Sequence, residues 1–301
     1  MTDALPKRAI LVVNAMSRQG EAAFEEACDK LAAAGLQLIE AHAVRDPDAM
    51  EGAVKAAVAR APMVIVGGGD GSLSSTVDQF VGTDTVFAAL PLGTANSFAR
   101  TLDLPLDLDG AINVIAYGRR KRIDLGVING DYFTNVAALG LSPLIADTVP
   151  HGLKRYLGML GYAIWAVRVA FKFRPFRLRI TLDDGTDVKC WATEARIANG
   201  RFHGGVELIE KARLDSGEMV IQAVTGKSLV HLAWSWFATL FKLRQRKLTY
   251  SEWRGRRMEL DARPRQKISI DGEAAAQTPV VVEVARGAIE VAAPREVNRQ
   301  G

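Results

Sequence analysis

The chain has 301 residues, of which 49% are hydrophobic, and its formal net charge is +4. This composition excludes an intrinsically disordered chain and is sufficient for one large folded domain or two modest ones. A mildly basic charge suits an anionic membrane surface or a polyphosphate ligand, and by itself it does not imply a nucleic-acid partner.

Apolar segments and cysteine usage favour a cytoplasmic protein without a membrane anchor. The apolar run 9–13 is too short for a secretory signal, and the run 156–167 is well short of the roughly 20 residues that span a bilayer. Cys28 and Cys190 lie far apart and lack metal-binding spacing. We therefore expect two buried, reduced thiols.

The first 125 residues predict a parallel α/β sheet. Short apolar runs alternate with segments of helical periodicity, which is typical of parallel strands whose carboxyl ends carry the ligand site. The predicted strands are 9–13, 36–43, 63–66 and 86–91, and the predicted helices are 21–34, 48–60 and 73–81.

The rest of the chain predicts a largely antiparallel β domain. Its strands are short, alternating or rich in β-branched residues, and turn signals such as Asn129-Gly130-Asp131 separate several of them. The predicted strands are 123–128, 132–138, 176–182, 187–197, 219–224, 257–262, 267–270 and 280–284, with helices near 152–173 and 228–246. We place the domain boundary near residue 125.

A glycine-rich turn, residues 67–72 (Gly-Gly-Gly-Asp-Gly-Ser), follows the third predicted strand. Glycines permit close approach of the backbone to a ligand, and the freed amides with the following helix can hold phosphate. An ordinary tight turn is the alternative. The dinucleotide fingerprint fails because Ser72 replaces its third glycine, and the Walker-like segment 225–228 fails because Ile221 replaces a required glycine.

Two further polar turns follow neighbouring strands. Residues 14–20 come after the first strand, and residues 92–100 come after the fourth strand, where they supply Thr94 and Asn96. The carboxyl ends of parallel strands share one sheet edge, so the three turns should lie together. Three ligand-competent turns at one edge favour a phosphate site over a chance cluster of glycines.

In this order the motifs resemble the diacylglycerol kinase catalytic-domain family, which includes sphingosine and ceramide kinases and bacterial lipid kinases. The matching segments cover nearly the whole chain: 14–20, 68–72, 91–96, 123–126, 199–205, 212–217 and 270–273. The resemblance implies a Rossmann-like parallel α/β domain over 1–125, similar to NAD kinase and phosphofructokinase. It also implies a C-terminal antiparallel β-sandwich over 126–301 that binds the lipid, with the extreme C-terminus packing back on the first domain.

The resemblance implies ATP-dependent phosphorylation of a lipid hydroxyl, on diacylglycerol, a sphingoid base or a related lipid, with Mg²⁺ as cofactor. Glu273 would be the general base and Asp70 a second catalytic residue. The implied metal ligands are Asp70, Asp124 and Asp215. The implied nucleotide-binding residues are Asn14, Ser17, Gly67, Gly68, Gly69, Gly71, Ser72, Thr94 and Asn96. From the residues alone, Asp271-Gly272 could equally be a hairpin turn and Asp124 a solvated acid.

Three positions depart from the family pattern. Ser97 stands where many bacterial members carry an aspartate that completes a water–magnesium network, Ser216 stands in the second metal motif in place of an acid, and Ala43 replaces a threonine. We therefore expect a weaker or rearranged metal site. Of the four histidines, His203 has the best claim to a site, because it lies within the 199–205 motif.

Two segments, 153–172 and 228–247, combine aromatic and apolar residues with basic ones, a pattern that suits helices lying on a membrane surface. Core helices packed on the β-sandwich would show the same pattern. The expected partners are ATP, a lipid substrate and a peripheral membrane surface at the inner face, with a homodimer as a further expectation and no nucleic acid. The alternatives are an NAD-kinase-like phosphotransferase acting on a soluble metabolite and a non-catalytic nucleotide- or lipid-binding regulator.

Overall fold

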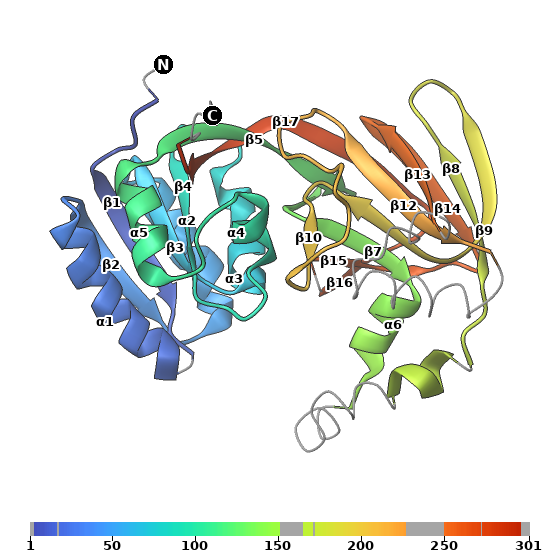
Figure 1. The fold of residues 1–301 in the computed structure, drawn as a ribbon, viewed down its shortest axis with the longest axis horizontal. Coiled ribbons are helices and arrows are strands. Elements are labelled where there is room, and N and C mark those ends of the chain that lie inside the picture. Colours follow the sequence, from blue (N-terminus) through green and yellow to red (C-terminus); the bar gives the residue numbers. More distant parts are fainter. Residues whose placement is uncertain are drawn as a thin grey trace, which may run out of the picture.

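The computed structural model describes residues 3–16, 18–150, 165–170, 172–226, 250–271 and 273–295 (Figure 1). Ser17, the expected membrane-surface helix 228–247 and most of the expected helix 153–172 lie outside these residues, although residues 165–170 are helical. Among the helices that can be described, none is both long and apolar enough to cross a bilayer.

The N-terminal part is a parallel sheet in the order β4–β3–β1–β2. Its strands are β1 (Arg8–Asn14), β2 (Gln37–Val44), β3 (Met63–Gly68) and β4 (Val86–Pro91). Every residue of β3 and β4 is buried, because helices cover both faces of a parallel sheet. Successive residues of each strand therefore point into two separate apolar cores, one on each face of the sheet. Because both faces are buried, these strands appear in the sequence as continuous hydrophobic runs.

One core lies under α1 (Arg18–Ala33) and α5 (Leu108–Tyr117), where Leu31 and Ile112 pack with Ile65 of β3. The other lies under α2 (Met50–Val58) and α4 (Ser97–Thr101), where Val54 and Phe98 pack with Val64 and its neighbours. A 3₁₀ turn, Pro47–Ala49, leads into α2. These helices fix the ends of β3 and β4, from which the glycine turns emerge.

The C-terminal part is antiparallel and forms the expected β-sandwich (Figure 1). Its strands are β5 (Arg119–Ile128), β6 (Asp131–Phe133), β7 (Val136–Gly140), β8 (Phe176–Thr181), β9 (Asp187–Ala198), β12 (Met219–Thr225), β13 (Tyr250–Gly255), β14 (Arg257–Arg263), β15 (Lys267–Ile270), β16 (Glu273–Gln277) and β17 (Val280–Ala293). A short hairpin, β10 (Phe202–His203) with β11 (Val206–Glu207), and helix α6 (Leu141–Thr148) complete the described elements. The predicted combination of a parallel α/β part and an antiparallel sandwich is confirmed.

Two long strands connect the parts. β5 and β17 pair antiparallel along most of their length, and the end of β17 also pairs parallel with β4, at Val291 and Phe87 (Figure 1). The register of β5 with β17 shifts between Ala285 and Ile289. The chain therefore passes from one part to the other inside a continuous strand, and residue 125 lies within β5.

Several local predictions are wrong in detail. The single helix expected over 73–81 is two pieces, α3 (Asp70–Ser74) and a 3₁₀ helix (Val77–Phe80), since the Thr76 hydroxyl donates back to the carbonyl of Ser72 at 2.9 Å. Helices α4, α5 and α6 and strands β10, β11, β13 and β16 were not predicted. The Asp107 side chain caps α5 by accepting from the Gly110 amide at 2.8 Å, a signal that the sequence does contain.

The two cysteines are free thiols, as expected, but Cys28 and Cys190 are half-buried rather than buried. Both lie at the margin of a core, Cys28 on α1 and Cys190 on β9. Burial raises the pKa of each thiol, so both favour the neutral form at neutral pH.

Candidate functional site

The two predicted glycine turns touch at the carboxyl ends of β3 and β4. The amide of Leu92 donates to the carbonyl of Gly68 at 2.9 Å. A Cβ atom on Gly93 would lie 2.5 Å from Cα of Gly69, and one on Gly68 would lie 2.6 Å from Cβ of Ser72. The backbone of the second turn therefore approaches that of the first at a distance that only glycine allows at position 93, and the Ser72 side chain leaves no room for a Cβ atom at position 68.

Asp70 and Asn14 join these turns to their neighbours. Oδ1 of Asp70, at the start of α3, accepts from the amide of Phe98 in α4 at 3.1 Å. Among the described residues its other carboxylate oxygen makes no hydrogen bond. The Asn14 side chain, after β1, donates to the Ser72 hydroxyl at 2.9 Å. The three turns are thus connected at one edge, with one Asp70 oxygen available to a ligand.

The two polar residues of the second turn have different surroundings. Thr94 is exposed and its hydroxyl is accessible to a ligand. Asn96 is buried in the left-handed conformation, with φ 49°, and its amide group both accepts from the Gly93 amide at 2.9 Å and donates to the Gly93 carbonyl at 2.7 Å. The Asn96 side chain therefore shapes the turn, and its predicted contact with nucleotide stays a prediction.

The other two acids predicted to bind metal have protein partners. Asp124 is buried, and its two oxygens accept from the amides of Gly217 at 2.6 Å and Gly287 at 2.8 Å. Gly287 lies in the irregular part of β17, so Asp124 holds that bend in place. Asp215 pairs with Arg213 and Lys121, both at 3.0 Å. Arg213, and then Lys121, hold the pKa of the Asp215 carboxyl down to about 2.

Within the described residues, no three His, Cys, Asp or Glu side chains gather closely enough to form a metal cage. Of the three predicted ligands, only Asp70 keeps a carboxylate oxygen that no other described residue contacts. This set fits a magnesium ion bound by one carboxylate, with water and substrate phosphates completing its shell, which is a common arrangement in kinases. It does not fit a cage built from all three acids.

Asp271 links the glycine-turn helix to the sandwich, and sequence reasoning missed this role. Its Oδ2 accepts from the Ser74 hydroxyl of α3 and from the amide and hydroxyl of Thr134, both at 2.9 Å. Its Oδ1 accepts from the amides of Asn135 at 3.2 Å and Val136 at 3.1 Å. These amides are turned away from sheet pairing, which explains why the strand predicted over 132–138 is divided into β6 and β7.

The strand that begins at Glu273, the predicted general base, follows the turn at Asp271. Asp271 has φ 44°, a left-handed conformation at the end of β15, and the chain returns as β16, which begins at Glu273. The only sequence signal was the Asp-Gly pair, which also suits a plain hairpin. The five hydrogen bonds of the carboxylate instead identify Asp271 as the residue that orients this turn.

The 199–205 motif belongs to the sandwich and contacts the start of α4. The Gly205 amide donates to the Ser97 hydroxyl at 3.0 Å, so Ser97 at the start of α4 contacts this motif directly. His203 is half-buried in β10. Burial, with Arg196 nearby, lowers the pKa of His203, although Asp271, Glu194 and Asp70 act in the opposite direction. His203 is thus neutral at pH 7 and close to charges from both parts of the molecule.

Comparisons with known proteins agree with this geometry. The profile of the family "Diacylglycerol kinase catalytic domain" matches residues 8–128, and that of the family "YegS C-terminal NAD kinase beta sandwich-like domain" matches residues 136–293. A protein of Chromohalobacter salexigens named a probable lipid kinase, YegS-like, is 34% identical over 175 residues, which is 55% of this chain and 53% of that protein. The match thus spans about half the length of that relative.

Two solved structures share the fold. A Bacillus anthracis protein provisionally described as a diacylglycerol kinase has a TM-score of 0.81 at 24% identity, covering 97% of this chain and 99% of that one. Yeast NADH kinase in complex with NADH has a TM-score of 0.55 at 11% identity, covering 97% of this chain and 84% of the kinase. At these identities the similarity establishes the fold alone, and it confirms the predicted likeness to NAD kinases.

Proposed function

The chain belongs to the diacylglycerol kinase catalytic-domain family, and we propose that it transfers the γ-phosphoryl group of ATP to the hydroxyl group of a lipid. The observation that carries this proposal is the meeting of two glycine turns, with Asp70 between them, opposite the turn that bears Asp271 and Glu273. Phosphoryl transfer depends mainly on positioning and charge stabilisation. The glycine turns can position the phosphates and stabilise their charge, and the turn with Asp271 and Glu273 can position the acceptor hydroxyl.

The nucleotide side of the reaction rests on the backbone amides of residues 68–72 and on the Asn14–Ser72 hydrogen bond. Those amides can donate to phosphate oxygens where glycine lets the ligand come close. The exposed Thr94 hydroxyl can donate beside them. When bound, Mg²⁺ neutralises charge on the phosphates, and the oxygen of Asp70 without a protein partner is the group that would hold it, through water.

On the acceptor side, the Glu273 carboxylate takes the proton of the lipid hydroxyl as that oxygen attacks the γ-phosphorus, while the bond from the γ-phosphorus to the β–γ bridging oxygen breaks and ADP leaves. Asp271 sets the position of the turn that carries Glu273, because its carboxylate is fixed to Ser74 and to residues 134–136. His203, being neutral, adds no positive charge that would lower the basicity of a neighbouring carboxylate. We propose that the protein works from the cytoplasm at the inner face of a membrane, where such a lipid resides.

A transfer assay tests this proposal. The protein is incubated with γ-labelled ATP, magnesium and, separately, diacylglycerol, sphingosine, ceramide, monoacylglycerol or NAD. We expect label on a lipid, with loss of at least 100-fold in kcat in Glu273→Gln, the usual contribution of general-base catalysis being about 10²–10⁴-fold. Asp70→Asn should also lose activity. Asp29→Asn, an exposed change on α1, is the matched control.

The similarity to NADH kinase favours one alternative, phosphorylation of a soluble metabolite. Label on NAD and on none of the lipids would support that alternative. Nucleotide binding without any transfer would instead support a regulator that has kept the fold. Full lipid kinase activity in Glu273→Gln would refute the assignment of the base while leaving the substrate class intact.

A further inference from the structure

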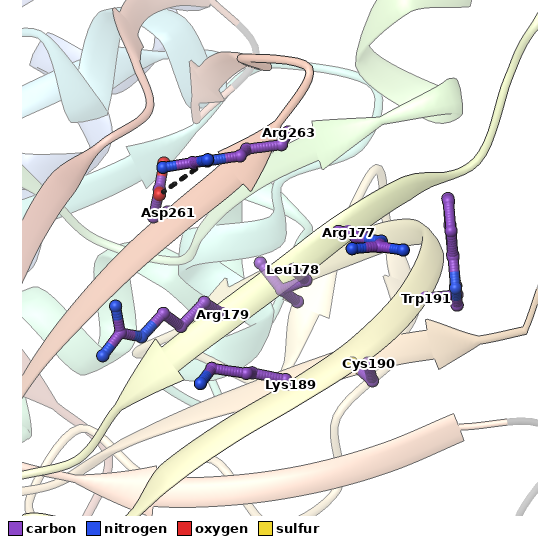
Figure 2. A pocket seen from close by; sticks show the side chains of 8 residues that line it. All are labelled: Arg177, Leu178, Arg179, Lys189, Cys190, Trp191, Asp261 and Arg263. Carbon is purple, nitrogen blue, oxygen red and sulfur yellow. Dashed lines mark ion pairs between the residues drawn. The ribbon is translucent and has the colours of Figure 1, made fainter.

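At the end of the sandwich away from the α/β part (Figure 1), exposed basic side chains line a hollow (Figure 2). It measures about 350 Å³ and is formed by the neighbouring strands β8, β9 and β14. Because side chains alternate along a strand, residues two apart share a face. The outward set comprises Arg177, Arg179, Lys189, Trp191, Asp261 and Arg263.

Strand register arranges these side chains in rows across the three strands. Arg177 is paired with Trp191 on one side and with Arg263 on the other. Two residues along, Arg179 lies between Lys189 and Asp261. Charge thus becomes more positive toward the start of β8.

In the second row, formed by Arg179, Lys189 and Asp261, the positive charges are largely neutralised by carboxylates. Arg179 pairs with Asp187 at 2.8 Å, and Lys189 contacts the other oxygen of Asp187 at 3.1 Å. Asp187 in turn keeps a lowered pKa because Arg179, and then Lys189, bond to it. An anion arriving at this row would compete with a carboxylate already in place.

The first row is compensated only in part. Arg177 contacts no carboxylate in the described part of the chain, and its guanidinium lies 5.2 Å from the centre of the Trp191 ring. Arg263 is turned toward Asp261 in a long ion pair, with its Nε 3.8 Å from the carboxylate, and its side chain is 86% exposed (Figure 2). Like charges directly opposite on neighbouring strands destabilise a sheet, and here the ion pair of Arg263 with Asp261 offsets that repulsion only in part.

We propose that the hollow binds a phosphate-bearing anion, held by Arg177 together with Arg263, whose guanidinium would turn to the anion from Asp261. The planar fork of arginine matches phosphate oxygens in pairs, and stacking on Trp191 limits the orientations of the Arg177 fork. The ligand is either the headgroup of an anionic phospholipid or a soluble phosphomonoester. This site lies on a different surface from the glycine turns and does not depend on kinase activity.

The test compares the wild-type protein with the double variant Arg177→Gln/Arg263→Gln. The control is Arg8→Gln/Lys55→Gln, which removes the same two charges from exposed positions on β1 and α2. Soluble glycerol phosphate is titrated at ionic strength held constant with chloride, with affinity and melting temperature as readouts. Flotation is measured with phosphatidylcholine vesicles, with and without phosphatidylglycerol.

We expect the wild type and the control to bind one of the two probes, and the double variant to bind it about 25-fold more weakly, on the basis of roughly fivefold per basic residue near an anionic surface. Without anion the double variant should melt close to the wild-type temperature, because the removed repulsion is offset by the loss of the ion pair with Asp261 and of the contact with Trp191. Binding to vesicles alone identifies a lipid headgroup, and binding to glycerol phosphate identifies a soluble ligand. Equal binding by the wild type and the double variant, or no binding by the wild type to either probe, would overturn the proposal.

Discussion

The substitution Asp271→Asn should lower both the stability and the kcat of the protein. The carboxylate accepts five hydrogen bonds, from Ser74, Thr134 (two), Asn135 and Val136. Asparagine has nearly the same shape and tolerates the left-handed conformation that Asp271 adopts. Its NH₂ group cannot accept, however, so whichever way the amide turns, at least two of the five donors lose their acceptor.

Hydrogen bonds to a charged group contribute about 1.5–3 kcal/mol each, with incomplete additivity. We therefore expect Asp271→Asn to lower the free energy of unfolding by about 3 kcal/mol. At about 2 °C per kcal/mol for a chain of this size, the melting temperature should fall by about 6 °C. Activity measured well below that temperature should fall in kcat more than in KM for ATP, because the base turn is displaced while the glycine turns are intact.

Chemical denaturation of Asp271→Asn beside the exposed control Asp29→Asn measures the first effect. Ser74→Ala provides a narrower perturbation, since it removes only the bond from α3 to the sandwich and should destabilise by about 1.5 kcal/mol. If Asp271→Asn stays within about 0.5 kcal/mol of the wild type, the range of an ordinary surface substitution, the reasoning about this carboxylate is wrong.

Three further outcomes follow from individual contacts. Gly93→Ala should weaken nucleotide binding and destabilise the fold by about 1–3 kcal/mol, because the new methyl group meets the Gly69 backbone. Gly52→Ala on α2, whose new methyl group meets nothing within 4 Å, is the control, and equal behaviour of the two in a nucleotide-binding assay would count against the close approach. Burial, with Asp131 and Glu51 nearby, raises the pKa of Asp78 to about 6, so the folded state keeps a proton that the unfolded chain releases and stability falls as pH rises from about 4 to about 6. Asp78→Asn should therefore stabilise the protein at pH 7, by at most about 1 kcal/mol because one side of the carboxylate is open to solvent, which screens its charge, and a melting curve unchanged at pH 7 would contradict this. For Asp215 the pH dependence of stability runs the other way. Its pKa is lowered to about 2, so the stabilisation from its ionised carboxylate is complete above about pH 4 and is lost toward pH 2. Asp215→Asn should therefore lower the free energy of unfolding by about 1 kcal/mol at pH 7 and make no difference near pH 2.

Sequence patterns were informative where the structure is local. The strand–turn–helix at residues 63–74 could be predicted because an apolar run, glycines and a following helix are encoded within a dozen neighbouring residues. The antiparallel part could be predicted because alternation along each strand reports which face is buried. The helix over 73–81 was wrong because the Thr76 hydroxyl competes for a helix carbonyl, a contact that helical periodicity does not register.

The sequence did not show which of the predicted metal-binding aspartates are available to a ligand. Asp124, Asp215 and Asp70 all appear as acids in motifs, but only their tertiary contacts distinguish them. Two amides from distant turns occupy Asp124, two cations occupy Asp215, and a single amide contacts Asp70. A carboxylate is available to a ligand only if the fold leaves it an oxygen, and that depends on residues far away in the chain.

By itself, then, the sequence determined the parallel α/β part, the antiparallel part and the glycine turns, because each depends on dihedral preferences and burial patterns of adjacent residues. Only the tertiary structure decided that β17 returns to pair with β4, that Ser74 meets Asp271 across 197 positions, and that Arg177 lies opposite Arg263. The physical reason is that strand register and long-range hydrogen bonds are fixed by the simultaneous packing of many elements, and no short segment contains that information.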